Sequence, residues 1–306
     1  MHKKTVIIIG VLDNPTSTNV SQAKAFINKG FNVIPINYRT LMSEYGIKTF
    51  EKIVLDTVEK YSPYLVLFCK CNGINPDLVS ECSKKTITWL WNPDVINEKI
   101  PRYPEVIQHA VRADFSSGTS LDIVRYFKEH GAKNCYHIFD GLDADVFKPV
   151  EPVEEFKCDI SFIGTKLDHR DQIKDILEQS GYDVKFYGHG YIGEVYNKEF
   201  AQVCCSSKYV LSINSLCGED LFFSNRLLRL MGCKRCVFHW DPFYVLKDMF
   251  IDGKEIILFR SAEELITKLK FLNNHEEIAE NGYIKVINNY TWEHSVDHIL
   301  RIIENA

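Results

Sequence analysis

The sequence predicts an α/β protein with two doubly wound, Rossmann-like domains that face a central cleft. Three observations support this fold class. Short, nearly continuous apolar runs alternate with helical patterns, which is typical of parallel sheets covered on both faces. The alternation stops at a segment rich in Pro and Glu, 146–157, and then begins again. A length of 306 residues is sufficient for two domains with separate cores.

Each element of the first half is predicted from a change of pattern. An apolar run bounded by turn residues predicts a strand, and apolar residues at helical spacing predict a helix. Strands are expected at 5–10, 31–36, 64–69, 86–91, 108–115 and 135–139. Helices are expected at 20–29, 49–61, 72–84 and 121–131.

The second half repeats this alternation. Strands are expected at 159–164, 184–187, 209–213, 236–240 and 255–259. Helices are expected at 170–180, 198–206, 262–273, 276–290 and 292–304, with a further short helix opening at 224–226. The expected division is a first domain at 1–149, a second domain at 150–290 and a final helix within 291–306.

Composition restricts the class of protein. A hydrophobic content of 45% and a charged content of 25% are typical of a soluble globular chain. The net charge of −5 argues against general nucleic-acid binding. No apolar run reaches the length of a transmembrane helix. We therefore expect a globular protein without a transmembrane segment.

The ten cysteines favour a cytoplasmic protein with reduced thiols, because most lie inside apolar runs, where cysteine acts as a small hydrophobe. Cys233 and Cys236 have the spacing of a redox motif, but they lie at a helix-to-strand turn, and no second pair completes a zinc site. His294 and His298 lie one helical turn apart without an evident third ligand. No metal site is expected.

The segment 212–241 predicts an anion site. It runs from a strand through a Gly-Glu-Asp loop into a short helix that begins near Arg226. We expect Ser224 to be the N-cap, because its hydroxyl can accept a hydrogen bond from a free N–H of the first turn. Exposed N–H groups, the helix dipole and the guanidinium together favour a bound phosphate.

Several segments resemble glycosyltransferases of the GT-B fold. Residues 141–149, GLDADVFKP, resemble the signature that enters the interdomain linker of many of these enzymes. Three further segments of the second half agree: 159–165 with Arg170, 225–238, and 253–265 with the two closing helices. Together they resemble the "glycosyl transferases group 1" domain of CgeB-like (spore-maturation type) proteins. In the first half, 91–94, 115–118 and 124–131 resemble the first domain of that family.

The resemblance implies an enzyme that moves a sugar from a nucleotide-diphosphate-sugar donor, with UDP or another nucleotide, to an unidentified acceptor. It implies a retaining, metal-independent reaction without a cofactor, and a C-terminal helix that crosses back to the first domain. Charge develops on the diphosphate as the glycosidic bond breaks, so Arg226 and Arg170, with Lys166 as alternate, are the candidate catalytic clamp. The alternative for both arginines is a solvated surface charge.

Other candidates for donor binding lie at strand ends and turns. Glycine at a strand end allows backbone to approach a ligand, and a Gly-rich turn could contact the nucleotide base or be an ordinary turn. Asn214 and Ser224 suit ribose or phosphate, with capping and turn chemistry as the alternative. The full set is Gly164, Thr165, Lys166, Tyr187, Gly188, His189, Asn214, Ser224, Asn225 and Glu219.

On the acceptor side, the loop after the first strand contributes Asp13, Asn14 and Thr16. An inverting reaction would need a general base, and a retaining one would let the donor phosphate receive the proton. The candidates for a base are Asp13, Asp94, His109 and Asp114. Asp94 is the preferred catalytic or acceptor contact, with a helix N-cap before Val95 as the alternative.

The sequence departs from the retaining enzymes at one position. They commonly place a Glu three residues after the clamp Arg to hold the ribose, and here Arg229 occupies that position. Glu219 or Asp220 would have to supply the carboxylate. Two rival functions therefore stay open: a nucleotide-sugar epimerase, and a binding module without catalysis. A dinucleotide oxidoreductase is disfavoured, because the first strand lacks a G-x-G-x-x-G fingerprint.

Overall fold

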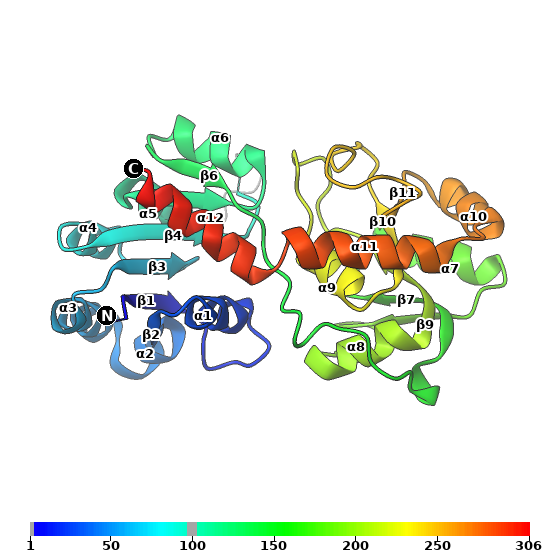
Figure 1. Ribbon diagram of the computed structural model, residues 1–306, viewed down its shortest axis with the longest axis horizontal. Coiled ribbons are helices and arrows are strands. Elements are labelled where there is room, and N and C mark those ends of the chain that lie inside the picture. The colour runs from blue at the N-terminus through cyan, green and yellow to red at the C-terminus, as the bar shows by residue number, and fades with distance from the viewer. Residues whose placement is uncertain (1–2, 97–102) are drawn as a thin grey trace. The chain divides into compact units, whose positions relative to one another are not determined.

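The computed structural model describes residues 3–96 and 103–306. The chain forms two compact units (Figure 1). Unit 1 comprises Met1–Asp140 and Trp292–Ala306, and unit 2 comprises Gly141–Thr291. Each unit is built on one parallel sheet with helices on both faces, which confirms the predicted fold class of two parallel-sheet α/β domains.

Unit 1 has a six-stranded parallel sheet in the order β2-β1-β3-β4-β5-β6. Its strands are β1 (Thr5–Gly10), β2 (Asn32–Asn37), β3 (Leu65–Cys69), β4 (Ile87–Asn92), β5 (Phe115–Gly118) and β6 (Cys135–His137). Alternate residues of β1 enter different cores: Ile7 and Ile9 pack on one face, and Val6 and Ile8 on the other. This two-sided burial explains why the strands are apolar at nearly every position.

The helices of unit 1 cover the two faces unequally. They are α1 (Thr18–Asn28), α2 (Tyr38–Tyr45), α3 (Ile47–Tyr61), α4 (Pro76–Ser83), α5 (Pro104–Arg112), α6 (Leu121–Glu129) and α12 (Trp292–Glu304). Residues of α3, α4, α5 and α6 share one core with the sheet, and residues of α1 and α12 share the other.

The C-terminal helix α12 is therefore part of unit 1 (red in Figure 1). Its Trp292 ring lies 4.8 Å from the Trp91 ring of β4. Two polar contacts join α12 to α1: Lys29 Nζ pairs with Asp297 Oδ2 at 2.6 Å, and Asn28 Nδ2 donates to Glu293 Oε1 at 2.9 Å.

Unit 2 has a five-stranded parallel sheet in the order β11-β10-β9-β7-β8. Its strands are β7 (Cys158–Ile163), β8 (Val184–Tyr187), β9 (Ser207–Ser212), β10 (Cys236–Trp240) and β11 (Ile257–Phe259). Its helices are the 3-10 turn η1 (Glu154–Phe156), α7 (Asp168–Gln179), α8 (Asn197–Ser206), α9 (Arg226–Gly232), α10 (Ala262–Phe271) and α11 (His275–Asn289). The apolar faces of α7, α10 and α11 pack with the sheet in one core.

Two elements of unit 1 differ from the sequence-based expectation: one prediction is wrong and one helix was missed. The expected strand at 108–115 is mostly the helix α5, and the strand β5 begins only at Phe115. Apolar residues at 106, 107, 110 and 111 have helical spacing, and Pro104 suits a first helical turn. The helix α2 was not expected, although Tyr38, Leu41, Met42 and Tyr45 recur at helical spacing, because this pattern extends over only eight residues.

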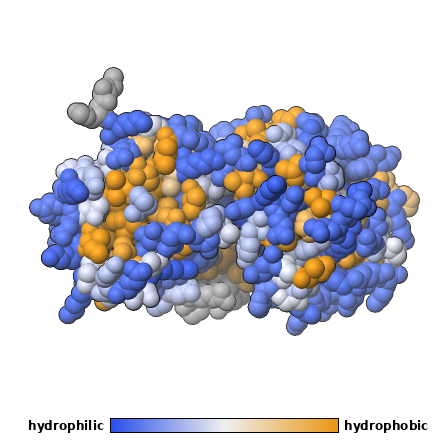
Figure 2. Space-filling view, turned by 90° about the horizontal axis from the view of Figure 1, so that it is seen from below, coloured by the Kyte–Doolittle hydropathy of each residue, from blue (hydrophilic) through white to orange (hydrophobic). Residues whose placement is uncertain are grey.

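The strand β2 forms one edge of the unit 1 sheet. Figure 2 views unit 1 from this side and shows apolar surface there. Pro35 lies within β2 and has no N–H to offer a further strand, which limits edge-to-edge pairing. Among the helices that the structure describes, none is long and apolar enough to span a membrane.

Candidate functional site

Two arginines meet at the carboxyl end of the unit 2 sheet. Arg170 lies in the first turn of α7, and Arg226 is the first residue of α9. The carbonyl of Ile213, directly after β9, accepts hydrogen bonds from Arg170 Nη2 at 2.8 Å and from Arg226 Nη1 at 2.8 Å. Arg170 Nη1 also donates to the carbonyl of Thr165 at 2.6 Å. The ends of β7 and β9 thus hold two guanidiniums beside each other.

An aromatic ring and a glycine fix the position of these guanidiniums. The Cζ atoms of Arg170 and Arg226 lie 5.1 and 5.0 Å from the centroid of the Phe162 ring. At such distances the ring face attracts a cation. A Cβ added at Gly164 would lie 3.1 Å from Arg226 Cζ and 2.8 Å from Phe162 Cζ. A side chain at position 164 would therefore displace Arg226.

Among the described residues, no acid forms an ion pair with this pair of guanidiniums. In the described part of the chain, the partners of both guanidiniums are backbone carbonyls and the Phe162 ring. Arg170 is only 2% exposed, and burial lowers its pKa. Burial and the charges of Arg170 and Arg229 lower the pKa of Arg226 to about 9. An anion bound here would relieve both the desolvation and the repulsion.

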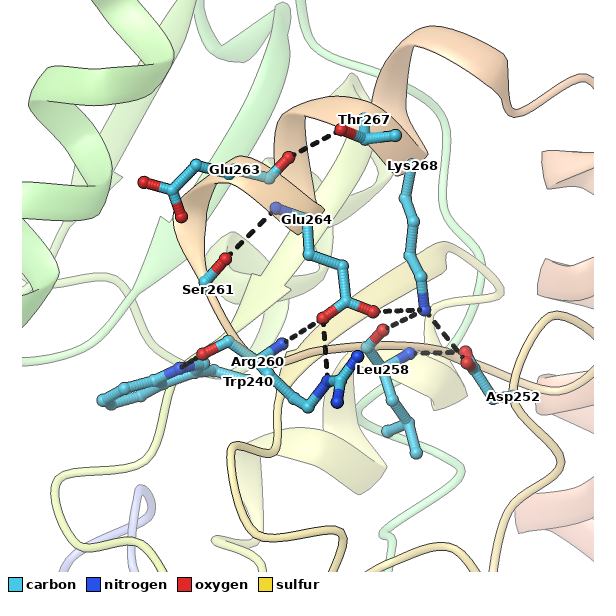
Figure 3. Close-up of polar contacts among 9 residues, drawn as sticks. All are labelled: Trp240, Asp252, Leu258, Arg260, Ser261, Glu263, Glu264, Thr267 and Lys268. Atoms are coloured by element: carbon cyan, nitrogen blue, oxygen red, sulfur yellow. Dashed lines mark hydrogen bonds and ion pairs between the residues drawn. The ribbon is translucent and has the colours of Figure 1, made fainter.

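Another arginine of unit 2 shows the contrasting, balanced arrangement (Figure 3). Arg260 Nε donates to Glu264 Oε2 at 3.2 Å, and Lys268 Nζ pairs with Glu264 at 3.2 Å and with Asp252 at 3.0 Å. The carbonyl of Arg260 also accepts a bond from Trp240 Nε1 at 3.2 Å. These charges compensate one another, so this cluster fixes the start of α10 and the end of β10.

Several polar atoms near Arg226 are buried and find no hydrogen-bond partner within residues 3–96 and 103–306. They include Ser224 Oγ, both side-chain polar atoms of Asn225, and Arg170 Nε. The prediction that Ser224 caps the helix is wrong, because α9 begins at Arg226 with Asn225 as N-cap and without a side-chain capping bond. Buried polar groups usually have partners, so a group of unpartnered ones indicates a ligand or ordered water.

The turn after β8 packs directly on the turn after β7. The N–H of Gly164 donates to the carbonyl of Tyr187, and the N–H of Lys166 donates to the carbonyl of His189, both at 2.8 Å. Gly188 has a φ of +123°, and a Cβ there would lie 2.3 Å from the carbonyl oxygen of Gly164. Gly188 is therefore required by backbone packing.

Two other residues of these turns are engaged within the protein. The Tyr187 ring is buried and lies edge-on to Phe156, with centroids 6.0 Å apart, so core packing occupies it. Lys166 Nζ lies 3.4 Å from a carboxylate oxygen of Asp171. The His189 side chain is exposed, and its contact with a base stays a prediction.

The loop between β9 and α9 is held by Asn214. Its Oδ1 accepts a hydrogen bond from the N–H of Ser224 at 3.3 Å, which is the turn chemistry considered as the alternative. Its carbonyl lies 3.1 Å from His169 Nε2, and the His169 ring lies 5.2 Å from the Trp240 ring. Glu219 lies in the same loop, partly buried.

Arg229, at the position where a Glu was expected, lies against the linker. Its Cζ is 4.6 Å from the centroid of the Phe147 ring. A Cβ added at Gly232, on the same helix, would lie 2.7 Å from the carbonyl oxygen of Phe147. The helix α9 therefore packs closely on the start of unit 2 through both residues.

Of the acceptor-side candidates in unit 1, Asn14 and Thr16 line a cavity of about 340 Å³. Asn14 Oδ1 accepts bonds from the N–H of Thr16 at 3.0 Å and from its hydroxyl at 2.9 Å. Asp13 lies on the same loop, where its carboxylate accepts a hydrogen bond from Thr40.

The candidate bases are in different surroundings. Asp94 forms an ion pair with Lys70, and the residues that would continue a helix from it, 97–102, lie outside the described residues. His109 is not suited to be a base at the strand ends: it is fully buried in α5, its Nε2 lies 2.9 Å from the Ile74 carbonyl, and burial lowers its pKa.

Asp114 is also not suited, because it lies at the wrong end of the sheet. Its carboxylate accepts hydrogen bonds from the N–H and hydroxyl of Thr88, at 2.8 and 2.9 Å, near the amino ends of β4 and β5. In open parallel sheets, ligands bind at the carboxyl ends.

Sequence reasoning missed three participants in the unit 2 site. The Ile213 carbonyl has no sequence signal, because any residue supplies one. Phe162 was recognised as a strand residue but not as a partner of both arginines. His239 lies buried in β10, where burial and the charge of Arg226 lower its pKa to about 3. Its neutral ring thus lies near the cationic pair.

Metal and disulfide chemistry find no support in the described residues. No group of three or more His, Cys, Asp or Glu side chains in 3–96 and 103–306 is placed to hold a metal ion. All ten cysteines are free, and Cys233 and Cys236 are both buried.

The two parallel-sheet α/β units define a protein of the GT-B glycosyltransferase fold class. Residues 162–301, which include both arginines, match the "Glycosyl transferase-like" family. A search of curated proteins finds no match.

Solved structures resemble the chain over nearly its whole length. An α-glucosyltransferase in complex with UDP and a 13-mer DNA has a TM-score of 0.73 at 12% identity, covering 99% of this chain and 100% of that chain. A glycosyltransferase from Rickettsia africae ESF-5 has a TM-score of 0.68 at 14% identity, covering 100% and 99%. The sucrose-phosphate synthase from Thermosynechococcus elongatus has a TM-score of 0.67 at 13% identity, covering 99% of each chain. At these identities the likeness establishes the fold.

Proposed function

We propose that the protein is a glycosyltransferase that moves a sugar from a nucleotide-diphosphate-sugar donor to an acceptor. The observation that carries this proposal is the pair of guanidiniums formed by Arg170 and Arg226, which no carboxylate of the described residues balances. A diphosphate is a strong match for such a pair, because arginine presents several N–H groups in a planar fork. The family match and the UDP complex of a fold relative support the same class of ligand.

The charge of the pair also suits the chemistry of transfer. Negative charge grows on the diphosphate as the glycosidic bond breaks, so fixed cations stabilise the transition state more than the ground state. Two guanidiniums can supply positive charge that a metal ion supplies in other enzymes, which supports a metal-independent reaction. On the resemblance we also propose a retaining outcome and the CgeB-like subtype, and the free cysteines support our proposal of a cytoplasmic location.

The residues around the arginine pair and those on the acceptor side are then proposed to contact the donor and the acceptor. Ser224 and Asn225 would contact the ribose or the phosphates with the buried polar atoms that have no partner in the described part of the chain. The backbone at Gly164 and Thr165 would approach the diphosphate, with Lys166 nearby. On the acceptor side, Asp13, Asn14 and Thr16 would line the binding site, and Asp94 would contact the acceptor hydroxyl. The other proposed donor contacts are Gly188, His189, Asn214 and Glu219.

The test is incubation of the protein with a panel of nucleotide sugars, with release of nucleoside diphosphate as the readout. One donor of the panel should release its diphosphate, and Arg226→Met should lower kcat/KM by about 100-fold to 1,000-fold, the cost typical of losing a transition-state contact. Arg260→Met is the matched control, because Arg260 is balanced by Glu264 in the same unit.

Three outcomes would count against the proposal. Equal rates of diphosphate release in the wild type and in Arg226→Met would show that turnover does not depend on the guanidinium pair. Conversion of the donor into an isomer without diphosphate release would identify an epimerase. Tight binding with unchanged donor after long incubation would identify a binding module.

A further inference from the structure

A cavity that the proposed function does not use lies in unit 2 at the amino ends of β9 and β10. Its volume is about 460 Å³, which is within the range of small-molecule sites. The arginine pair lies at the opposite, carboxyl end of the same sheet. β9 has six residues, and at about 3.3 Å per residue its two ends are roughly 17 Å apart. The cavity is therefore separate from the site of the arginine pair.

Two cations that line this cavity have no carboxylate partner among the described residues. Lys208 is exposed near the start of β9, and its Nζ lies 5.1 Å from the centroid of the Tyr209 ring. Arg235 is partly buried, and its Nη2 donates to the carbonyl of Cys205 at 2.7 Å. Its Nε is buried and finds no partner in the described part of the chain. The protein thus uses only part of the hydrogen-bonding capacity of this guanidinium, and both cations are available to an anion.

The other charges of the described lining do not cancel these two cations. Lys234 Nζ forms an ion pair with Glu280, so these two charges compensate each other. Glu276 is exposed in the first turn of α11, where the helix dipole favours a carboxylate. Two unpaired cations against this one carboxylate leave an excess of positive charge among the described residues of the lining.

A second cavity, of about 480 Å³, shares Lys208 and Arg235 with the first. It also contains Asp159 and Asp183, and within the described residues neither carboxylate pairs with the two shared cations. Asp159 Oδ2 instead accepts a hydrogen bond from the N–H of Asp183 at 2.9 Å. Because these two acids would repel an anion, the first cavity is the more favourable place for one.

The lining of the first cavity also indicates the chemical class of the anion. Two cations are matched best by a group with about two negative charges, which a phosphomonoester carries at pH ~7 and a single carboxylate does not. Arginine binds phosphate oxygens through its planar fork, and lysine adds a point charge. Pro149, Cys233, Cys236 and Ala279 add apolar surface that a free phosphate ion would not use. The lining therefore fits the phosphate ester of a small organic molecule.

The helix α9 joins this cavity to the arginine pair (yellow in Figure 1). Arg226 is its first residue, and Cys233, directly after its last residue, lines the cavity. Lys234 has a φ of +56°, a left-handed conformation that ends the helix, and Arg235 then leads into β10. Most residues of α9 are buried in a close-packed interior, so a displacement at one end of this short helix reaches the other.

We infer that this cavity binds a small phosphomonoester between Lys208 and Arg235, as an effector site separate from the arginine pair. The bound phosphate fixes the turn at 233–235 and, through α9, the position of Arg226. Binding of the phosphomonoester does not depend on the proposed function, whereas its effect on nucleotide binding rests on it.

Calorimetric titrations of the full chain test the site. The probes are glycerol 3-phosphate and glucose 6-phosphate, with glycerol and glucose as their neutral counterparts and acetate as a carboxylate. All are titrated into Arg226→Met, because the arginine pair can also bind phosphate. We expect saturable binding of at least one phosphomonoester. Adding Lys208→Met or Arg235→Met should weaken that binding about tenfold, equivalent to about 1.4 kcal/mol.

Lys254→Met is the matched control, because Lys254 is an exposed lysine of unit 2 outside the described lining of both cavities. Unchanged melting temperatures show that the variants are folded. Should Arg235→Met unfold because it loses the bond to the Cys205 carbonyl, Lys208→Met carries the test, since Lys208 is exposed. No saturation by either phosphomonoester, equal or tighter binding of acetate or a neutral counterpart, or an affinity unchanged by Lys208→Met would overturn the inference.

A second measurement tests the effect on the arginine pair. In the wild type, saturation with the phosphomonoester should change the affinity for a nucleoside diphosphate about fivefold or more, and Lys208→Met should abolish this change. A change that persists in Lys208→Met would be competition at the arginine pair, and it would overturn the effector role, as would an unchanged affinity. Phosphomonoester binding that requires Lys208, with no nucleotide binding by the wild type, would sustain this site and reject the proposed function.

Discussion

Arg170 and Arg226 hold positive charge where folding alone gives no reason for it. Burying a cation is costly unless a carboxylate compensates it, and here backbone carbonyls and the Phe162 ring do so only in part. Residues kept at the expense of stability are expected at functional sites. Burial lowers the pKa of both arginines, and the neighbouring cations lower that of Arg226 further.

Gly164 gives a prediction at this scale. Gly164→Ala should lower the affinity for the nucleotide about tenfold or more, because the added methyl group would meet Arg226 Cζ at 3.1 Å. Calorimetric titration with a nucleoside diphosphate measures the effect. Gly193→Ala is the control, since a Cβ there has no heavy atom within 4 Å. Wild-type affinity in Gly164→Ala would mean that the position of Arg226 is unimportant for binding.

The sequence identified the two arginines but not the groups that hold their guanidiniums in place. The pattern of a helix start beside an Arg identified Arg226, and the segment after β7 identified Arg170. The Ile213 carbonyl that joins them is a backbone atom without a residue preference. The Ser224 cap was wrong because Ser224 lies one residue too early, and its buried hydroxyl has no partner among the residues that the structure describes.

At the scale of elements, most strands were predicted to within one or two residues, and a few elements agree at both ends. β8 and β10 agree at both ends, as does α12, because their apolar patterns stop at sharp polar boundaries. The segment 108–115 failed because a buried helix turn and a buried strand are equally apolar over so short a length.

The cluster at the start of α10 gives a pH-dependent prediction. Partial burial raises the pKa of Glu264, but hydrogen bonds from Arg260 and Lys268 outweigh this effect, so its pKa in the folded protein is lowered. A lowered pKa means that ionised Glu264 stabilises the fold above its unfolded pKa of about 4.3, and that this contribution is lost as the pH falls through the folded pKa.

Glu264→Gln should therefore destabilise unit 2 by up to about 1 kcal/mol at pH ~7 and by less at pH ~3. Thermal unfolding at both pH values measures this difference. Glu277→Gln, an exposed substitution on α11, is the control and should change little at either pH. A loss of stability for Glu264→Gln that is as large at the lower pH would contradict the role of the ionised carboxylate.

At the scale of the whole molecule, the chain leaves unit 1 at Asp140 and returns to it with α12. The helix buries Trp292, Val296, Ile299 and Ile303 in the core of unit 1. Burial of four such side chains is worth about 6–12 kcal/mol, at about 1.5–3 kcal/mol each. This equals the whole stability of many domains, about 5–15 kcal/mol.

Deletion of residues 292–306 should therefore unfold unit 1 and leave unit 2 folded. Hydrogen exchange should lose protection in β1, β3 and β4, while nucleotide binding through Arg170 and Arg226 persists. Arg301→Ala, on the exposed side of α12, should leave both units intact. Retained protection throughout unit 1 after the deletion would show that α12 is dispensable for its fold.

The most direct test of the central claim compares nucleoside diphosphates with monophosphates of the same base in calorimetric titrations. If the Arg170–Arg226 pair holds a diphosphate, the diphosphate of at least one base binds about tenfold or more tightly than its monophosphate. Arg226→Met then removes that difference without lowering the melting temperature. Equal affinities for mono- and diphosphates of every base, or a difference that survives in Arg226→Met, would contradict the account.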